Sequence, residues 1–178
     1  MKRLWTACSG AGLMFALAAP SPCLAASNTV STLLAADSAN QLETHAYVNC
    51  HSSSGSCEFI AGADLRTPDG VIGFPPDLWA RQTTELRPSN RLAYLDVHVT
   101  DPPWSRVQKS GGQDVTTAIY QGDGLPDKYQ TIGTIDSTDW QTGQPRTNET
   151  VFVCTHIQVV YAGVNLTSPS TCAQTTFS

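Results

Sequence analysis

The chain of 178 residues carries ten basic and fifteen acidic residues, which gives a net charge of −5 at neutral pH. This acidic balance argues against nucleic acid and against an anionic membrane surface as partners. The length suits one domain with one ordinary hydrophobic core.

Residues 1–25 have the organisation of a secretory signal peptide. Lys2 and Arg3 precede an apolar run, LWTACSGAGLMFALAA, and the small residues Cys23 and Ala25 occupy the −3 and −1 positions of a cleavage site. A membrane anchor is the alternative, but the run is short and is interrupted by Cys, Ser and Gly. We therefore expect a secreted chain that begins at Ala26 and has no membrane span after cleavage, with a net charge of −7 because two basic residues are lost.

Four cysteines follow the signal segment: Cys50, Cys57, Cys154 and Cys172. An even number in an exported chain predicts two disulfides. A zinc site built from the four thiolates would need closely spaced pairs, whereas the intervals here are 7, 97 and 18 residues.

The first elements of the mature chain predict an arm followed by a hairpin. Residues 26–40 are small and mostly polar, which indicates a flexible arm or an edge strand. Residues 41–50 and 57–65 both alternate apolar and polar side chains, as half-buried strands do, and the polar loop HSSSGS separates them. Facing residues of such a hairpin are close enough for a disulfide, so geometry predicts the pair Cys50–Cys57. Elimination then leaves Cys154–Cys172.

The middle of the chain continues the pattern of strands and turns. TPDG, residues 67–70, is a turn, and VIGFPPDLW is expected to wrap an edge, with a short helix possible from Asp77. Residues 91–99 form the clearest alternating strand, with Ala93, Leu95, Val97 and Val99 on one face.

The sequence also predicts strands in the last third of the chain. Segments 115–120 and 129–135 are short candidates, residues 151–161 are rich in β-branched side chains and predict a central strand, and AQTTF closes the chain. Because Gly, Pro, Asn and Asp separate these segments and no long helical period appears, we predict an all-β fold. It is an antiparallel β-sandwich or barrel-like single domain over residues 41–178.

The stretch GDGLPDKYQ resembles part of an acidic calcium loop, in which several oxygen ligands come from one tight turn. Only Asp123 and Asp127 supply carboxylates, and Gln121 and Gln130 stand at two other ligand positions. The glycines and Pro126 also suit a simple hairpin turn between the 115–120 and 129–135 strands. We favour the turn and keep calcium as the alternative.

A possible polar site is formed by Asp96 and His98, which share one strand face, and by His156 in the central strand. A solvated outward face explains the first two without any chemistry. The order His51, Asp96, Ser110 matches that of trypsin-like proteases, but the residues around it do not. No cofactor motif is present, so we expect no cofactor.

Two further features bear on partners. Asn148 and Asn165 begin N-glycosylation sequons. A binding module would expose an aromatic patch, for which the candidates are Trp79, Trp104, Tyr120 and Trp140.

The segments THIQVVYAGVNLTSPSTCAQ and PPDLWARQTTELR resemble small exported proteins of mycobacteria and related actinobacteria, which carry no assigned activity. The resemblance implies export and adds nothing about chemistry. We therefore predict a secreted β-sandwich that binds an extracellular ligand or an envelope component, or has a structural role. The alternative is a small extracellular hydrolase or metal-dependent enzyme that uses Asp96 and His98.

Overall fold

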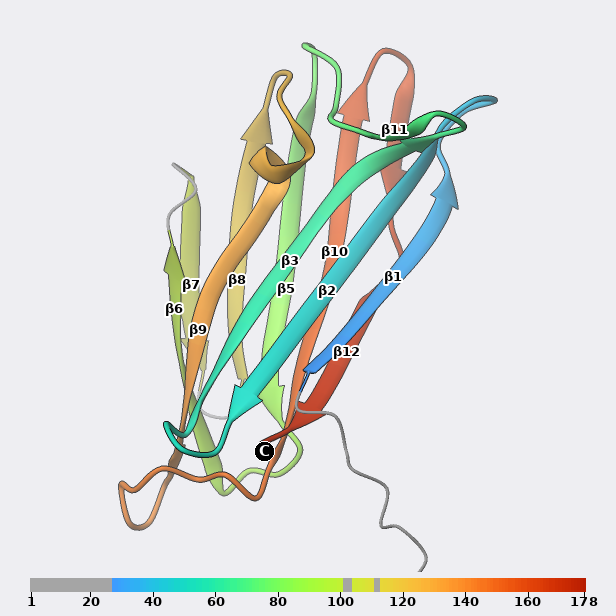
Figure 1. Ribbon diagram of the computed structural model, residues 1–178. Coiled ribbons are helices and arrows are strands. Elements are labelled where there is room, and N and C mark those ends of the chain that lie inside the picture. Colours follow the sequence, from blue (N-terminus) through green and yellow to red (C-terminus); the bar gives the residue numbers. More distant parts are fainter. Residues whose placement is uncertain (1–26, 101–103, 111–112) are drawn as a thin grey trace, which may run out of the picture.

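The computed structural model describes residues 27–100, 104–110 and 113–178 (Figure 1). Over these residues the chain forms two antiparallel sheets that pack face to face, so the predicted β-sandwich is confirmed. The expected signal peptide, residues 1–25, lies outside the described residues. No helix in the described part of the chain is long and apolar enough to cross a membrane.

The first sheet, sheet A, has the strand order β1-β2-β3-β9-β6, and β4 pairs with β3. Its strands are β1 (Ser27–Ala35), β2 (Gln41–His51), β3 (Ser56–Thr67), β4 (Gly70–Ile72), β6 (Ala93–Thr100) and β9 (Gln130–Asp139). The segment expected to be an arm or an edge strand is thus largely the edge strand β1.

The second sheet, sheet B, has the order β11-β10-β5-β8-β7, and β12 also pairs with β10. Its strands are β5 (Trp79–Pro88), β7 (Ser105–Ser110), β8 (Gln113–Gln121), β10 (Thr150–Tyr161), β11 (Val164–Thr167) and β12 (Thr171–Thr176). The single 3₁₀ turn of the described chain, η1 (Pro126–Tyr129), precedes β9. The prediction that residues 151–161 form a central strand is confirmed, because β10 has strand neighbours on both sides.

The core consists of two apolar clusters separated by a polar layer. One cluster includes Leu42, Ala80 and Tyr129, and the other includes Val48, Leu86 and Ile135. Between them the inward positions are polar and buried: Thr44, Gln82, Thr84, Thr131, Thr155 and Thr171. The Gln82 amide donates to the Ala61 carbonyl at 2.8 Å, and the Thr84 hydroxyl donates to Thr155 at 3.1 Å. These bonds compensate part of the loss of hydration that burial imposes on the polar layer, whereas the Gln82 amide oxygen has no partner among the described residues.

Both predicted disulfides are present, and they lie in different surroundings. Cys50 and Cys57 are directly paired residues of β2 and β3, and both are buried in the core. Cys154 and Cys172 are directly paired residues of β10 and β12, and Cys172 is exposed on the outward face of sheet B.

Two local predictions were wrong. No helix begins at Asp77; the chain instead enters β5 at Trp79, because the alternating residues of 79–88 fit a strand between β10 and β8. The GDGLPDKYQ stretch is not a hairpin turn, because β8 belongs to sheet B and β9 to sheet A. It carries the chain from one sheet to the other at the upper end in Figure 1.

Candidate binding site at the open end of the sandwich

Three segments meet at the upper end of the sandwich in Figure 1. They are the turn 36–40 between β1 and β2, the segment 73–78 before β5, and residues 161–164 at the β10–β11 turn, which together we call the open end. At Gly73 an added Cβ would lie 1.8 Å from the carbonyl oxygen of Gly124. Glycine is therefore needed where the segment before β5 passes the chain that leaves β8.

A cavity of about 520 Å³ opens between these segments. Its lining is mainly apolar and includes Leu65, Ile72, Phe74, Tyr161 and Val164. Small-molecule sites in proteins are usually hollows of this size with an apolar lining and a few polar groups.

An aromatic cluster forms the base of the open end. The Phe74 ring lies 4.9 Å from the Tyr129 ring and 6.2 Å from the Tyr161 ring, and Tyr120 lies 5.9 Å from Tyr129. All three pairs are edge-to-face, the arrangement that the aromatic quadrupole favours. Of this cluster, Phe74 and Tyr161 line the cavity, and Tyr129 packs against Phe74 behind them.

The Tyr161 hydroxyl is the unusual polar atom of this region. It is buried and has no hydrogen-bond partner among the described residues. Burial raises the pKa of Tyr161, and the nearby carboxylates of Asp37 and Asp77 raise it further. The hydroxyl is therefore neutral at physiological pH and remains able to bond to a ligand group.

The turn that follows Tyr161 is held in an uncommon conformation. Ala162 has φ +21° and Gly163 has φ +83°, and hairpin turns of two residues favour positive φ at both positions. Alanine is costly there, and the Ala162 N–H donates to the Asp77 carboxylate at 2.7 Å. Ala162 also lines the cavity, so a strained residue lies at its wall.

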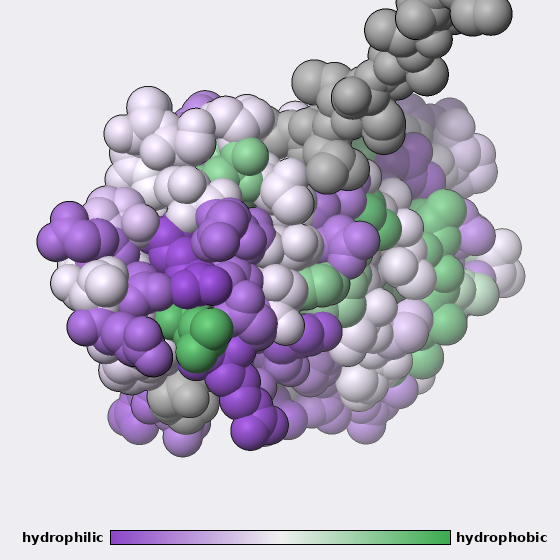
Figure 2. Space-filling model, turned by 90° about the horizontal axis from the view of Figure 1, so that it is seen from below, coloured by the Kyte–Doolittle hydropathy of each residue, from purple (hydrophilic) through white to green (hydrophobic). Residues whose placement is uncertain are grey.

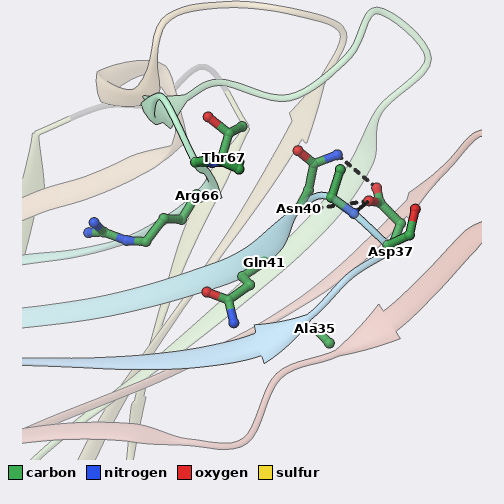
Figure 3. Close-up of a pocket in the computed structure, with 9 residues that line it drawn as sticks. Ala35, Asp37, Asn40, Gln41, Arg66 and Thr67 are labelled. Carbon is green, nitrogen blue, oxygen red and sulfur yellow. Dashed lines mark hydrogen bonds between the residues drawn. The ribbon is translucent and has the colours of Figure 1, made fainter.

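Asp37 organises the opposite rim. Its carboxylate accepts bonds from the backbone N–H groups of Ala39 at 2.8 Å and Asn40 at 2.9 Å, and from the Asn40 side chain at 2.8 Å. The bond from the Asn40 side chain, followed by the two backbone bonds, lowers the pKa of Asp37, so this exposed carboxylate stays ionised. A second cavity of about 410 Å³ adjoins the same turn (Figure 3). There the Arg66 guanidinium points away from Asp37.

Arg66 instead forms an ion pair with an acidic group on the outward face of sheet A. It donates to Glu43 at 2.6 Å, and Glu43 is directly opposite Asp64 across the β2–β3 pair. Both carboxylates are more than nine-tenths buried. Burial, followed by the charge of Glu43, raises the pKa of Asp64 to about 6, and burial lowers the pKa of His45, whose Nδ1 lies 3.6 Å from Asp64.

The predicted polar site is only partly assembled. His98 Nε2 lies 3.5 Å from Asp96 and 3.6 Å from Asp136, and Lys109 bonds to Asp96. His98 and Asp136 are more than half exposed, and none of the three is a lining residue of the cavities above. The cluster is thus a solvated network on β6 and β9. Among the described residues no group of three or more His, Cys, Asp or Glu could hold a metal ion.

The remaining predicted residues lie apart from this cluster. His156 is on β10 in sheet B, whereas Asp96 and His98 are on β6 in sheet A, so the three do not converge. Asn148 and Asn165 are both exposed.

The GDGLPDKYQ stretch is organised around a side chain of its own. The Lys128 ammonium donates to the Gln121 carbonyl at 2.9 Å and also to the Asp123 carbonyl. Tyr129 donates to the Gly122 carbonyl at 2.8 Å. A calcium loop would direct backbone carbonyl oxygens at the metal ion, whereas these carbonyl oxygens accept hydrogen bonds from Lys128 and Tyr129.

Of the predicted aromatic residues, Trp104 and Trp140 are exposed by 71 % and 53 %, Trp79 is at 36 %, and Tyr120 is buried. Sequence reasoning missed the aromatic cluster of Phe74, Tyr129 and Tyr161. The apolar spacing of 157, 159 and 161 on the last long strand was the one signal that pointed Tyr161 inward.

No protein-family model matches the chain, and no curated protein matches it. Two solved structures match over most of their length, with low similarity. The crystal structure of the yeast GGA1_GAE domain-P21 has 7% identity and a TM-score of 0.29, and covers 82% of this chain and 97% of that chain. The GAE domain of GGA2p from Saccharomyces cerevisiae has 12% identity and a TM-score of 0.26, and the match covers 83% of this chain and 97% of that chain. Because both TM-scores are this low, the fold assignment rests on the arrangement of the strands in this structure and not on these two matches.

Proposed function

We propose that this protein is an exported binding module and that the open end is its ligand site. The observation that carries the proposal is the cavity of about 520 Å³ that Tyr161 lines, together with the buried hydroxyl of this residue, which has no hydrogen-bond partner among the described residues. A buried polar group without a partner costs stability. Its retention beside an apolar hollow is expected where a ligand supplies the missing bond.

The lining defines the class of ligand. Leu65, Ile72 and Phe74 favour an apolar or aromatic body, whereas Asp37 at the rim is an ionised carboxylate and Asp77 is a second acidic neighbour. No basic residue is among the described lining residues of this cavity. We therefore assign the site to a small amphiphile with an apolar body and a cationic or hydrogen-bond-donating head.

Export is supported by the features that suit an oxidising compartment. The two disulfides persist outside the cytosol, and the first 25 residues have the pattern of a cleavable leader. Intact-mass measurement of the exported protein should give a chain that starts at Ala26. A mature protein that retains Met1 would exclude cleavage.

The ligand site is tested with simple probes. Ligand-observed NMR on the folded protein should detect benzyltrimethylammonium, while 4-tert-butylbenzoate, an aromatic anion of comparable size, should bind more weakly. Ile72→Trp, which adds bulk at an exposed position of the wall, should abolish the signal, and Asp37→Asn should remove the preference for the cation.

Asp69→Asn is the matched control, because Asp69 is an exposed acid on the neighbouring 67–70 turn and does not line the cavity. If both probes bind equally weakly to the native protein and to Ile72→Trp, the open end is not a ligand site.

A further inference from the structure

The two outward faces of the sandwich carry opposite charge, which the overall charge of −5 conceals. On sheet A the outward charged positions are Glu43, Glu58, Asp64, Asp96, Asp136 and Arg66. On sheet B they are Arg81, Glu85, Arg87 and Arg106. Acidic side chains therefore dominate one face and guanidinium groups the other, and an anionic partner would meet sheet B.

One part of sheet B is hollowed. A cavity of about 270 Å³ at the β7–β8 edge is lined by Trp104, Ser105, Arg106, Thr117 and Ile119. The Trp104 side chain is 71 % exposed. Its backbone is nevertheless fixed, because its carbonyl accepts the Ile119 N–H at 3.0 Å. A large aromatic ring is thus exposed to solvent on a fixed backbone, in a hollow that Ile119 also lines.

Two exposed guanidinium groups, those of Arg81 and Arg106, lie at or next to this hollow. Arg87 is engaged, since its Nε lies 3.4 Å from Glu85 and its guanidinium stacks 4.4 Å from the Phe152 ring. Arg81 and Arg106 are both exposed, and within the described ranges neither lies at ion-pair distance from a carboxylate. Arg81 does not line the hollow, but it is directly opposite Ile119 in the β5–β8 pair and is therefore the neighbour of a lining residue.

We propose that this hollow binds an acidic polysaccharide, with one sugar ring stacked on Trp104 and anionic groups paired with Arg106 and Arg81. The apolar faces of sugar rings pack on exposed aromatic rings, and guanidinium forks bind carboxylate or sulfate by paired hydrogen bonds. The hydroxyls of Ser105 and Thr117 line the same hollow and match the hydroxyls of a sugar.

The spacing of the two cations also fits a repeating polymer. Arg106 on β7 is opposite Thr117 of β8, and Arg81 on β5 is opposite Ile119, two residues further along β8, so their backbones are about 12 Å apart. That separation is comparable to an extended disaccharide, in which every second sugar carries its charge on the same side. A peptide offers no ring of this kind for Trp104, and a membrane surface does not require a hollow.

The binding test uses defined probes on the folded, disulfide-bonded protein. Oligogalacturonate and a heparin-derived hexasaccharide supply carboxylated and sulfated sugars, cellohexaose is the neutral sugar, and polyglutamate is the acidic peptide. Calorimetry at low salt should show binding of at least one anionic sugar, weaker binding of cellohexaose and polyglutamate, and a loss of affinity as salt is added.

The variants assign the binding to this hollow. Trp104→Ala, Arg106→Gln and Arg81→Gln should each weaken binding about tenfold or more. Arg87→Gln, on the same face, and Trp140→Ala, an exposed tryptophan at the other end, should leave it unchanged. Thermal melting of each variant confirms folding, which is expected because the three replaced side chains are exposed.

Two results would overturn the proposal. One is the absence of binding by both anionic sugars, or equal binding by the native protein and the Arg81 and Arg106 variants. The other is equal binding of polyglutamate, which would mean that the arginines attract any polyanion. Neither result affects the open end, because the two sites share no lining residue.

Discussion

Each end of the sandwich buries a large polar side chain, and the two side chains differ in how they are bonded. At the lower end in Figure 1, which residues 89–92 and 139–149 form and which we call the closed end, Glu149 is 1 % exposed and fully engaged. Its carboxylate accepts bonds from Ser89 at 2.8 Å, from Arg146 at 2.6 Å and from Asn90. At the open end the buried hydroxyl of Tyr161 has no such partner.

The loop of the closed end is organised by the same kind of bonding. Bonds from the Thr142 N–H, the Arg146 side chain and the Gln141 N–H lower the pKa of Asp139 to about 2. The surface of this end is mostly hydrophilic, with separate hydrophobic patches (Figure 2). The bonding of Glu149 indicates a structural role. The Ser137 hydroxyl, buried beside this loop, also has no partner among the described residues, but it lines none of the cavities described above, whereas Tyr161 does line one. The comparison can be tested one residue at a time.

The largest change in the free energy of unfolding is expected at the closed end. Glu149→Ala removes the acceptor for Ser89, Asn90 and Arg146, so the free energy of unfolding should fall by about 3 kcal/mol or more. Urea denaturation of the native protein and the variant measures this difference in the free energy of unfolding. Glu58→Ala, at an exposed outward position of β3, is the control and should change stability by less than about 0.5 kcal/mol. Equal stability of the two variants would show that the Glu149 network does not hold this end.

A stabilising change is expected next to the open end, at Asp64. The raised pKa of about 6 means that the folded state binds a proton more tightly than the unfolded state, whose carboxyl titrates near 3.8. The stabilisation of the folded state by protonated Asp64 is complete below about pH 4 and is lost as the pH rises through 6. Asp64→Asn should therefore raise the free energy of unfolding at pH 7 by about 2 kcal/mol and change little at pH 3.5.

The pH dependence distinguishes Asp64 from its neighbours. The lowered pKa of His45 has the opposite sign, because its stabilising effect is present above about pH 6.5 and is lost as the pH falls through the folded value. Unfolding by urea at pH 3.5, 5 and 7 separates the two contributions, with Asp69→Asn as an exposed control. If Asp64→Asn is less stable than the native protein at pH 7, the carboxylate has a stabilising partner and the assignment is wrong.

A small effect is expected for the tyrosines of the open end. Tyr161→Phe removes a hydroxyl without a partner, so stability should be unchanged or higher by up to about 1 kcal/mol. Tyr129→Phe removes the bond to the Gly122 carbonyl and should cost about 1 kcal/mol. Thermal melting of both variants compares them directly. A greater loss for Tyr161→Phe than for Tyr129→Phe would show that the Tyr161 hydroxyl is already satisfied.

Much of sheet A follows from the sequence because the first disulfide sets a register. Once Cys50 faces Cys57, residue 43 must face residue 64, and the structure shows this pairing. The juxtaposition of Glu43 and Asp64 could therefore have been predicted, although neither was named as a site residue. The alternation of residues 91–99 was equally informative about β6, whose inward positions are buried.

The open end could not be derived in this way. Its aromatic cluster joins Phe74, Tyr129 and Tyr161, which come from distant parts of the chain, and periodicity reports only which face a residue occupies. The path between β8 and β9 was also undetermined, because Gly, Pro and Asp suit a hairpin and a crossing between sheets equally well. For β5, Pro75 and Pro76 suggested an edge wrap, yet the strand begins after them and lies inside sheet B.

The smallest change in stability is expected in the GDGLPDKYQ stretch, whose Gly124 lies against Gly73 of the open end. Asp123 and Asp127 are exposed, and two carboxylates would give a calcium Kd no tighter than about millimolar. At about 1 mM calcium the stabilisation is then about 0.4 kcal/mol or less, which shifts the melting temperature by about one to two degrees. The Lys128 ammonium, which already binds the Gln121 and Asp123 carbonyls, would also repel a metal ion.

The double replacement Asp123→Asn, Asp127→Asn should therefore change the melting temperature little, and equally with calcium or with a chelator. Lys128→Met is the informative companion, because it removes the ammonium and leaves both carboxylates. It should destabilise the turn slightly without creating calcium dependence. If millimolar calcium instead raised the melting temperature of the native protein by about ten degrees, well beyond the weak-site estimate, and the double replacement abolished that rise, the stretch would be a metal site. Lys128 would then have to move away from the carbonyl oxygens that it contacts.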